Sequence, residues 1–247
     1  MVLYQLPLED PMRVITIYGA QGIVFAWFLY LAYRILKRDR KRLNLIFSGF
    51  YLSVVVGTFF NFIYGPIANE QIVLILNFVT NFGAFYAPIF FIVFNLILLK
   101  SEKVITPIKQ LIIFIAYGIY LFCMIFFVLA GEGWGVSLNA FTEWKPVWHL
   151  PFFLYVFLGV TIFAIVPLLY LSFQIYNKFE DEQLKKKWKF FIIGVIALIG
   201  FMYAIFFANF LGQEYPIIRT LIVPIGLVLN LIGGYLNYLG VGRQLEK

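Results

Sequence analysis

Seven long apolar runs, separated by short connections, fill almost the whole of this 247-residue chain. A membrane core of roughly 30 Å is crossed by about 20 apolar residues of α-helix, and each run reaches that length. Strands of a membrane barrel would alternate in polarity, whereas these runs are apolar on all sides. We therefore predict an all-α membrane protein, a bundle of seven transmembrane helices with approximate spans 13–36, 43–64, 71–99, 107–130, 148–176, 188–211 and 217–240.

The composition supports the membrane assignment. Hydrophobic residues make up 63% of the chain and charged residues only 13%, whereas a soluble domain carries about a quarter charged residues. We expect a multi-pass protein of the cell membrane, with residues 1–247 forming one domain. Residues 1–11 have no basic segment typical of a signal peptide, so the first span is expected to remain as the first helix.

Basic residues predict the orientation, because short loops rich in Lys and Arg stay in the cytoplasm. The N-terminus should then lie outside and the C-terminus inside. Contact with anionic lipid and this topology explain the net charge of +7 without nucleic acid. The inner side holds 16 of the 19 basic residues, namely Arg34, Lys37, Arg38, Arg40, Lys41, Arg42, Lys100, Lys103, Lys109, Lys178, Lys185, Lys186, Lys187, Lys189, Arg243 and Lys247, and the outer side holds Arg13, Lys145 and Arg219.

Small residues recur at intervals of four along several spans. Residues at i and i+4 share one helix face, and small residues on such a face let neighbouring helices approach closely in a membrane. We therefore predict packing faces at Gly49, Ser53, Gly57 and Asn61, at Gly200, Ala204 and Ala208, and at Gly226, Asn230, Gly234 and Tyr238. A further stripe, expected to face the bundle interior, contains Asn77, Asn81, Ala84, Pro88 and Asn95. Pro88, Pro167 and Pro224 are expected to bend their helices.

Amide side chains gather at one depth. Counted from the predicted outer ends at about 1.5 Å per residue, five of them fall in the outer half of the membrane, where an inward orientation avoids exposing an amide to lipid. They either pack helices together through hydrogen bonds or line a ligand pocket. The candidate ligand-binding residues are Gln21, Asn61, Asn77, Asn81 and Asn209.

The longest predicted outer connection, residues 131–148, contains Trp134, Trp144 and Trp148. Tryptophan is enriched at the lipid headgroups, so we interpret the loop as an interfacial anchor. The alternative is a lid over an outward-facing pocket.

Chemistry-bearing residues are scarce within the spans. Their central parts contain no lysine or acid, which excludes a retinal Schiff base and a proton relay of the usual kind. His149 and Cys123 are each the sole residue of their type, too few for a zinc triad or paired haem ligands. We expect no enzymatic activity, no cofactor and no metal site.

The order of these features resembles the seven-helix N-terminal sensor region of many prokaryotic histidine kinases. The resemblance rests on the basic cluster Arg34 to Arg42, Phe59-Phe60-Asn61-Phe62, Phe85-Tyr86-Ala87-Pro88 before Lys100-Ser101-Glu102, the segment Lys185 to Lys189, and the glycine-rich segment Gly233 to Gly242. It implies an outward-facing signal site and output through the last span. The chain departs from that pattern because it ends soon after this span, so output is expected to pass through a separate partner.

Three functions remain open. One is a sensor that binds a small uncharged ligand or lipid in the outer half and signals through its inner loops. The second is a structural subunit of a larger membrane complex, and the third is a carrier in which spans one to three and five to seven form parallel repeats. Oligomeric state is left open, and contacts with a cytoplasmic partner or lipid are expected at Arg38, Arg40, Lys41, Arg42, Lys185, Lys186 and Lys187.

Overall fold

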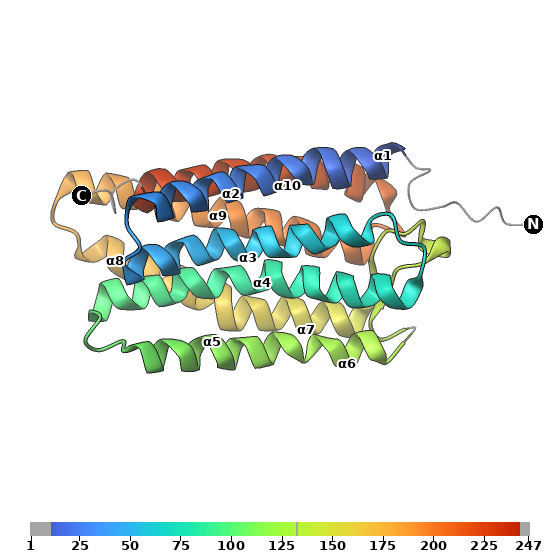
Figure 1. Ribbon diagram of the computed structural model, residues 1–247, viewed down its shortest axis with the longest axis horizontal. Helices are drawn as coiled ribbons and strands as arrows, with labels where there is room; N and C mark the ends of the chain where they lie inside the picture. The colour runs from blue at the N-terminus through green and yellow to red at the C-terminus, as the bar shows by residue number, and fades with distance from the viewer. Residues whose placement is uncertain (1–10, 132, 243–247) are drawn as a thin grey trace, which may run out of the picture.

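A computed structural model describes residues 11–131 and 133–242. Within this part of the chain, seven helices are long and apolar enough to cross a membrane, so the predicted all-α class with seven candidate spans is confirmed. The helices run alongside one another as an elongated bundle (Figure 1). In chain order the spans are α1 (Pro11–Val14) with η1 (Ile15–Ala20) and α2 (Gln21–Arg38), α3 (Arg42–Tyr64), α4 (Glu70–Lys100), α5 (Pro107–Phe122) with α6 (Met124–Leu129), α7 (Leu150–Val160) with η3 (Thr161–Ile165) and α8 (Val166–Lys178), α9 (Glu182–Leu211), and α10 (Pro216–Asn237) with η4 (Tyr238–Gly242).

Two of the predicted helix starts differ from the structure for a clear physical reason. The fifth span begins at Leu150 because the two preceding residues form strand β2 (Val147–Trp148), which pairs antiparallel with β1 (Val136–Ser137). The sixth span begins at Glu182, earlier than the predicted residue 188, because the Asp181 carboxylate accepts hydrogen bonds from the backbone N–H groups of residues 183 and 184. Such a cap satisfies donors that a helix start leaves open.

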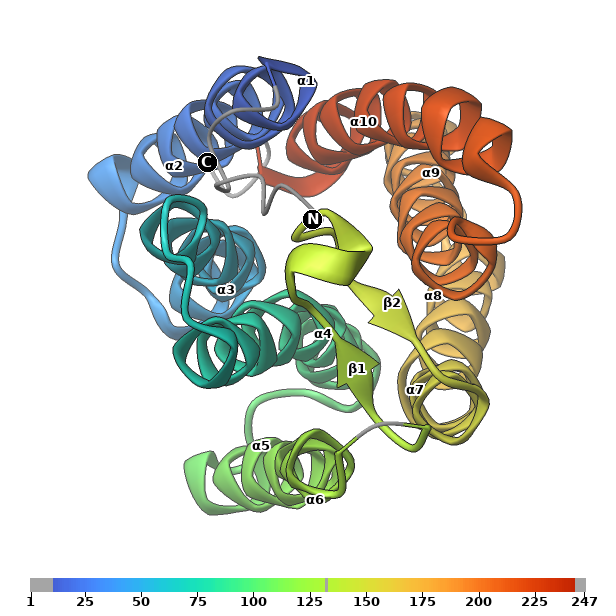
Figure 2. The ribbon, with the colours of Figure 1, turned by 90° about the vertical axis from the view of Figure 1, so that its right-hand side faces the viewer.

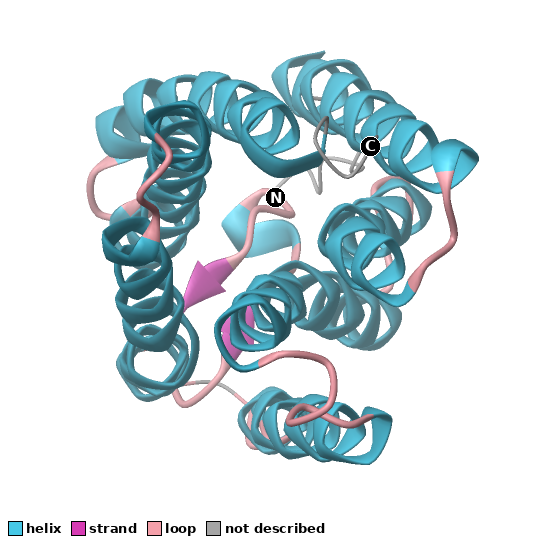
Figure 3. Ribbon diagram, turned by 90° about the vertical axis from the view of Figure 1, so that its left-hand side faces the viewer, coloured by secondary structure: helices cyan, strands magenta, loops and turns pink. Residues whose placement is uncertain are grey.

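The two ends of the bundle differ in their connections. We call the end with β1, the 3₁₀-helix η2 (Ala140–Thr142) and β2 the loop end, and the opposite end, with the connections at 39–41, 101–106 and 179–181, the basic end. Figure 3 shows the bundle from the basic end, with helices surrounding the short β1–β2 ladder. Arg243 and Lys247, predicted at the basic end, lie outside the described residues.

Glycines bring two helix pairs into close contact, and one of these glycines, Gly57, belongs to a predicted packing face. A Cβ on Gly83 of α4 would lie only 2.9 Å from the Cα of Gly57 on α3. On α10, a Cβ on Gly233 would lie 2.8 Å from the backbone oxygen of Gly194 on α9. Backbones this close gain the van der Waals packing that drives helix association in membranes. Pro88 and Pro224 lie inside continuous helices, whereas Pro167 follows the π-helical turn η3.

Aromatic rings fill the basic half of the bundle. Phe50 of α3 stacks on Phe91 of α4 with ring centroids 4.1 Å apart, and Phe91 meets Phe191 of α9 at 5.3 Å. Phe47 and Phe94 add a further contact at 5.1 Å. This cluster closes the bundle interior toward the basic end.

The fourth span lies at the edge of the bundle. Figure 2, which views the loop end, shows α5 and α6 outside the ring formed by the other helices. The span is attached mainly to α4, where the Tyr117 hydroxyl donates to the Phe85 carbonyl oxygen at 3.0 Å and the Tyr86 hydroxyl donates to the Phe114 carbonyl oxygen at 2.9 Å.

Candidate functional site: a cavity at the loop end

A cavity of about 910 Å³ lies between the helices at the loop end. This volume is within the 300–1,000 Å³ range of small-molecule sites. Its walls come from α1, η1, α2, α3, α4, α8, α9 and α10 and from the segment that runs from η2 to β2. All five predicted amides line it: Gln21, Asn61, Asn77, Asn81 and Asn209.

Hydrogen bonds link four of these amides to one another or to a neighbouring helix. The Asn81 amide donates to the Asn77 side-chain oxygen at 3.0 Å, and the Asn77 amide donates to the Tyr64 hydroxyl at 3.1 Å. The Asn61 amide donates to the side-chain oxygen of Gln21 and so joins α3 to α2. An amide side chain offers two donor hydrogens and an oxygen with two lone pairs, so one bond leaves capacity for a ligand.

The predicted stripe on α4 accounts for one wall. Asn77, Asn81, Ala84 and Pro88 all line the cavity, at helical intervals of three and four residues. Asn95, further along the same face, is fully buried below the cavity and donates to the Ser172 hydroxyl of α8 at 2.9 Å. The stripe therefore faces the bundle interior, as the sequence predicts.

Two other polar groups in the cavity wall lack hydrogen-bond partners within the described part of the chain. They are the hydroxyl of Thr80 and the side-chain nitrogen of Asn230. Buried polar atoms are nearly always paired with protein or water. Both atoms are shielded by neighbouring protein atoms from the open space of the cavity.

Below the amides the wall is mostly apolar. The floor is formed by Phe50 and Phe91 of the aromatic cluster together with Leu168 of α8 and Val195 of α9. A molecule that fills the cavity would thus meet polar groups near the loop end and hydrocarbon toward the basic end.

The segment from η2 to β2 covers the loop end of the cavity. Figure 2 shows it lying over the centre of the helix ring, and residues 141–147 line the cavity. Trp148 is 1% exposed and packs on Phe206 with ring centroids 5.5 Å apart, while Trp144 is 7% exposed. The interpretation of these two tryptophans as headgroup anchors is therefore wrong, because both rings face protein; only Trp134, at 60% exposure, has a surface available to lipid.

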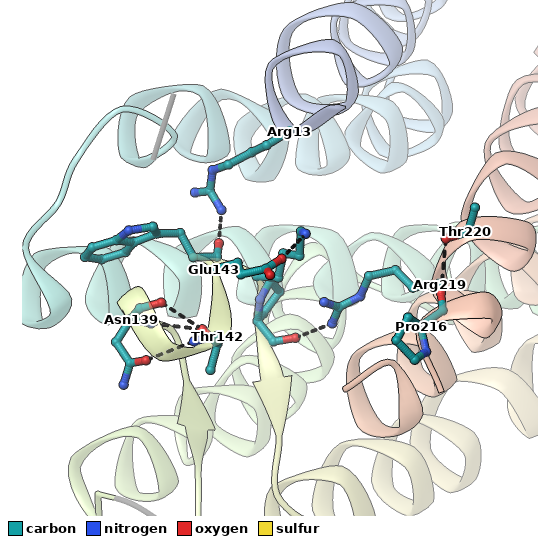
Figure 4. Close-up of polar contacts among 10 residues, drawn as sticks. Arg13, Asn139, Thr142, Glu143, Pro216, Arg219 and Thr220 are labelled. Carbon is teal, nitrogen blue, oxygen red and sulfur yellow. Dashed lines mark hydrogen bonds and ion pairs between the residues drawn. The ribbon is translucent and has the colours of Figure 1, made fainter. Parts of the chain in front are cut away.

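Two arginines from different helices hold this segment (Figure 4). Arg13 of α1 donates to the Trp144 carbonyl oxygen, and Arg219 of α10 donates to the Pro146 carbonyl oxygen at 2.7 Å. The chain turns sharply as it reaches the first of these two carbonyls, with positive φ at Glu143 (52°) and Trp144 (56°). We call residues 139–147, held in this way, the lid.

Sequence reasoning missed both arginines as site residues, because it used them only as charges that report topology. The informative signal was their position, since each stands within the first turns of a helix at the loop end. Their convergence on one loop depends on tertiary structure, which links segments far apart in the chain.

The predicted contact residues at the basic end are in different environments. Arg42 is partly buried and donates to the Ile105 carbonyl oxygen at 2.6 Å and to the Gln110 side-chain oxygen at 3.0 Å, so it holds the connection after α4. Arg38 donates to the Tyr238 hydroxyl. Exposed side chains remain at Arg40, Lys41, Lys186 and Lys187, while Lys185 is half-buried beside Glu182.

Asp39 and Lys41 form a local pair at this end. Their charged atoms are 2.9 Å apart, and the hydrogen bond from Lys41 holds the pKa of the Asp39 carboxyl below its usual value. Both groups are solvent-exposed, so the pair contributes little to stability.

The single histidine, His149, and the single cysteine, Cys123, lie outside the cavity wall. The His149 ring lies 2.8 Å from the Ser137 hydroxyl in the β1–β2 ladder, and Cys123 is a free thiol between α5 and α6. Within the described residues, no three His, Cys, Asp or Glu side chains form a cluster that could hold a metal ion.

No protein-family profile matches this chain, and no curated protein matches it in sequence.

Proposed function

We propose that this protein is a receptor-like membrane module that binds a small ligand or lipid in the loop-end cavity. The loop end faces the outside, and the basic end meets a separate protein partner in the cytoplasm. The observation that carries the proposal is the cavity of about 910 Å³ with all five amides in its wall.

Helix packing alone gives a poorer account of this arrangement. Protein interiors are close-packed, with few voids larger than a water molecule, and interhelical hydrogen bonds do not need a large cavity beside them. The amides in the wall keep hydrogen-bonding capacity beyond the bonds that they make to protein.

The lid and α10 offer a route from the cavity to the basic end. Arg219 contacts the lid at one end of α10, and Tyr238 accepts a hydrogen bond from Arg38 at the other. Between these ends the Tyr51 hydroxyl of α3 donates to the Gly234 carbonyl oxygen at 2.9 Å. A ligand that favours one position of the lid would shift the population of α10 positions by its difference in affinity for the two states.

Native mass spectrometry of protein gently extracted from its own membrane tests the proposal. We expect a reproducible bound small molecule, and its loss in the variant Asn81→Leu, which removes a cavity amide. The matched control is Asn177→Leu at an exposed site near the basic end, which should keep the molecule. Wild-type protein that carries no added mass, or an Asn81→Leu variant that retains it in full, would contradict the proposal.

A solute carrier is a second candidate, favoured by one feature of the wall. The cavity is lined by spans one to three and five to seven, and no described residue of α5 or α6 contributes. Asn61 and Asn209, each followed by phenylalanine in the sequence, face it from the second span of each half. Purified protein in liposomes should then move solute down a gradient, and inert vesicles across a broad solute panel would exclude this candidate.

A further inference from the structure

Arg219 brings a positive charge to the cavity wall. Its guanidinium carries five N–H donors, of which one donates to the Pro146 carbonyl oxygen. Within the described residues no carboxylate is paired with it, although the Glu143 carboxylate, which pairs with Lys145 at 2.6 Å, is close enough to attract it. The remaining donors are available to an anion.

The Arg219 side chain lies close to the backbone at Gly212, in the turn between α9 and α10. A Cβ on Gly212 would lie 2.9 Å from the Arg219 Nε and 2.1 Å from the Ala208 carbonyl oxygen. Any larger residue at 212 would displace the arginine. Gly212 thus leaves the space in which the guanidinium faces the cavity.

Apolar side chains lead away from this arginine along the inner face of α10 as far as Asn230, and we call this face the apolar track. Arg219, Val223, Leu227 and Asn230 line the cavity at intervals of four, four and three residues. At about 1.5 Å per residue, this face extends roughly 16 Å from the arginine toward the basic end. Leu198, Met202 and Ile205 of α9 line the cavity beside it, and Phe50 and Phe91 close it.

We infer that the cavity binds an anionic amphiphile, with one acyl chain on the apolar track and a carboxylate or phosphate head at Arg219. The inference rests on the proposed function and specifies its ligand class, which differs from the uncharged ligand expected from the sequence. The inference depends on the position of the Arg219 charge at one end of a long apolar wall. A guanidinium binds carboxylate and phosphate through paired N–H donors, while the wall excludes water from the chain.

Binding of tritiated palmitate to the full-length protein in nanodiscs of phosphatidylcholine tests the inference, with empty nanodiscs as background. Unlabelled palmitate, lysophosphatidate and hexadecanol serve as competitors with the same kind of chain and different heads. Palmitate or lysophosphatidate should compete at least tenfold better than hexadecanol, because a hydrogen bond to a charged group is worth about 1.5–3 kcal/mol. Which acid competes better identifies the head as carboxylate or phosphate.

Variants separate the head from the chain. Arg219→Gln should weaken palmitate binding by roughly tenfold or more and leave hexadecanol competition unchanged, whereas Arg219→Lys keeps the charge and should retain part of the affinity. Val223→Trp should obstruct the track and weaken all three amphiphiles. Arg34→Gln, at an exposed arginine remote from the cavity, is the matched control and should change nothing.

The outcomes distinguish this inference from the proposed function. Equal competition by palmitate and hexadecanol, or unchanged palmitate binding in Arg219→Gln, overturns the anionic head and leaves a lipid-binding cavity in place. If palmitate, lysophosphatidate and hexadecanol all fail to bind displaceably, the ligand is not an amphiphile of this class. In that case a bound mass of another kind in the native spectrum still supports the proposed function.

Discussion

At the scale of single residues, glycines and arginines decide how the helices and loops meet. Gly83 and Gly57 allow two backbones to touch, and the arginines at both ends of the bundle donate to backbone carbonyl oxygens of connecting segments. Such contacts use few residues to fix segments that the hydrophobic effect does not hold together inside a membrane.

Gly83→Ala should destabilise the bundle by about 1–3 kcal/mol, because the new methyl group overpacks a rigid backbone contact. Thermal unfolding in mild detergent measures the effect. Gly22→Ala is the control, since a Cβ at that position meets no heavy atom within 4 Å. Equal stability of the two variants would contradict the assigned contact between α3 and α4.

Arg42→Met should also destabilise the protein, by about 1–3 kcal/mol. The substitution leaves the partly buried carbonyl oxygen of Ile105 without its hydrogen-bond donor. The exposed Arg40 provides the matched control, and Arg40→Met should leave the unfolding temperature unchanged. If both variants behave alike, Arg42 contributes only surface charge.

At the scale of elements, the lid is the segment that most links distant parts of the chain. It is tied to α1 by Arg13, to α10 by Arg219 and to the start of α4 by Asn139, whose amide donates to Glu70 at 3.2 Å. Its own 3₁₀ turn is capped by Asn139, which accepts from the backbone of residues 141 and 142. The lid is therefore ordered by contacts from several helices.

Arg13→Met should loosen the lid without unfolding the helices. Amide hydrogen exchange in residues 139–147 should become faster, while exchange in α4 and α9 stays slow, because local opening needs less free energy than global unfolding. Lys109→Met at the basic end is the control. Unchanged exchange in the lid would show that Arg13 does not hold it.

Particular residues show how far the sequence leads. Asn77 and Asn81 could be assigned to the cavity because their spacing and depth are local properties of one helix. Hydropathy also located the seven spans, but it placed the start of the sixth too late because it does not register the cap at Asp181. Trp144 and Arg219 could not be assigned correctly, since the burial of a loop tryptophan and the direction of a terminal arginine depend on packing between the first helix, the last helix and the lid.

At the scale of the whole molecule, the bundle is asymmetric along its length. The aromatic cluster around Phe91 closes the basic half, and the cavity with its lid lies toward the loop end. This asymmetry suits a protein that samples its surroundings from one side and presents a basic surface on the other.

The proposed orientation can be tested with an impermeant maleimide on intact cells. In a Cys123→Ser background, a cysteine substituted for Phe141, which is 75% exposed in the lid, should react from outside. A cysteine substituted for Lys103 at the basic end should react only after the membrane is opened. The reverse pattern would invert the topology that short basic loops predict.

The most direct test of the ligand cavity is an experimental density map of the protein purified in its native lipids. The account predicts an elongated density between α2, α3, α4, α9 and α10. The end of this density nearer the loop end should lie at Arg219, beside the amide cluster around Asn81. Helices that close together and leave no space at these residues, or a cavity that contains only water, would contradict it.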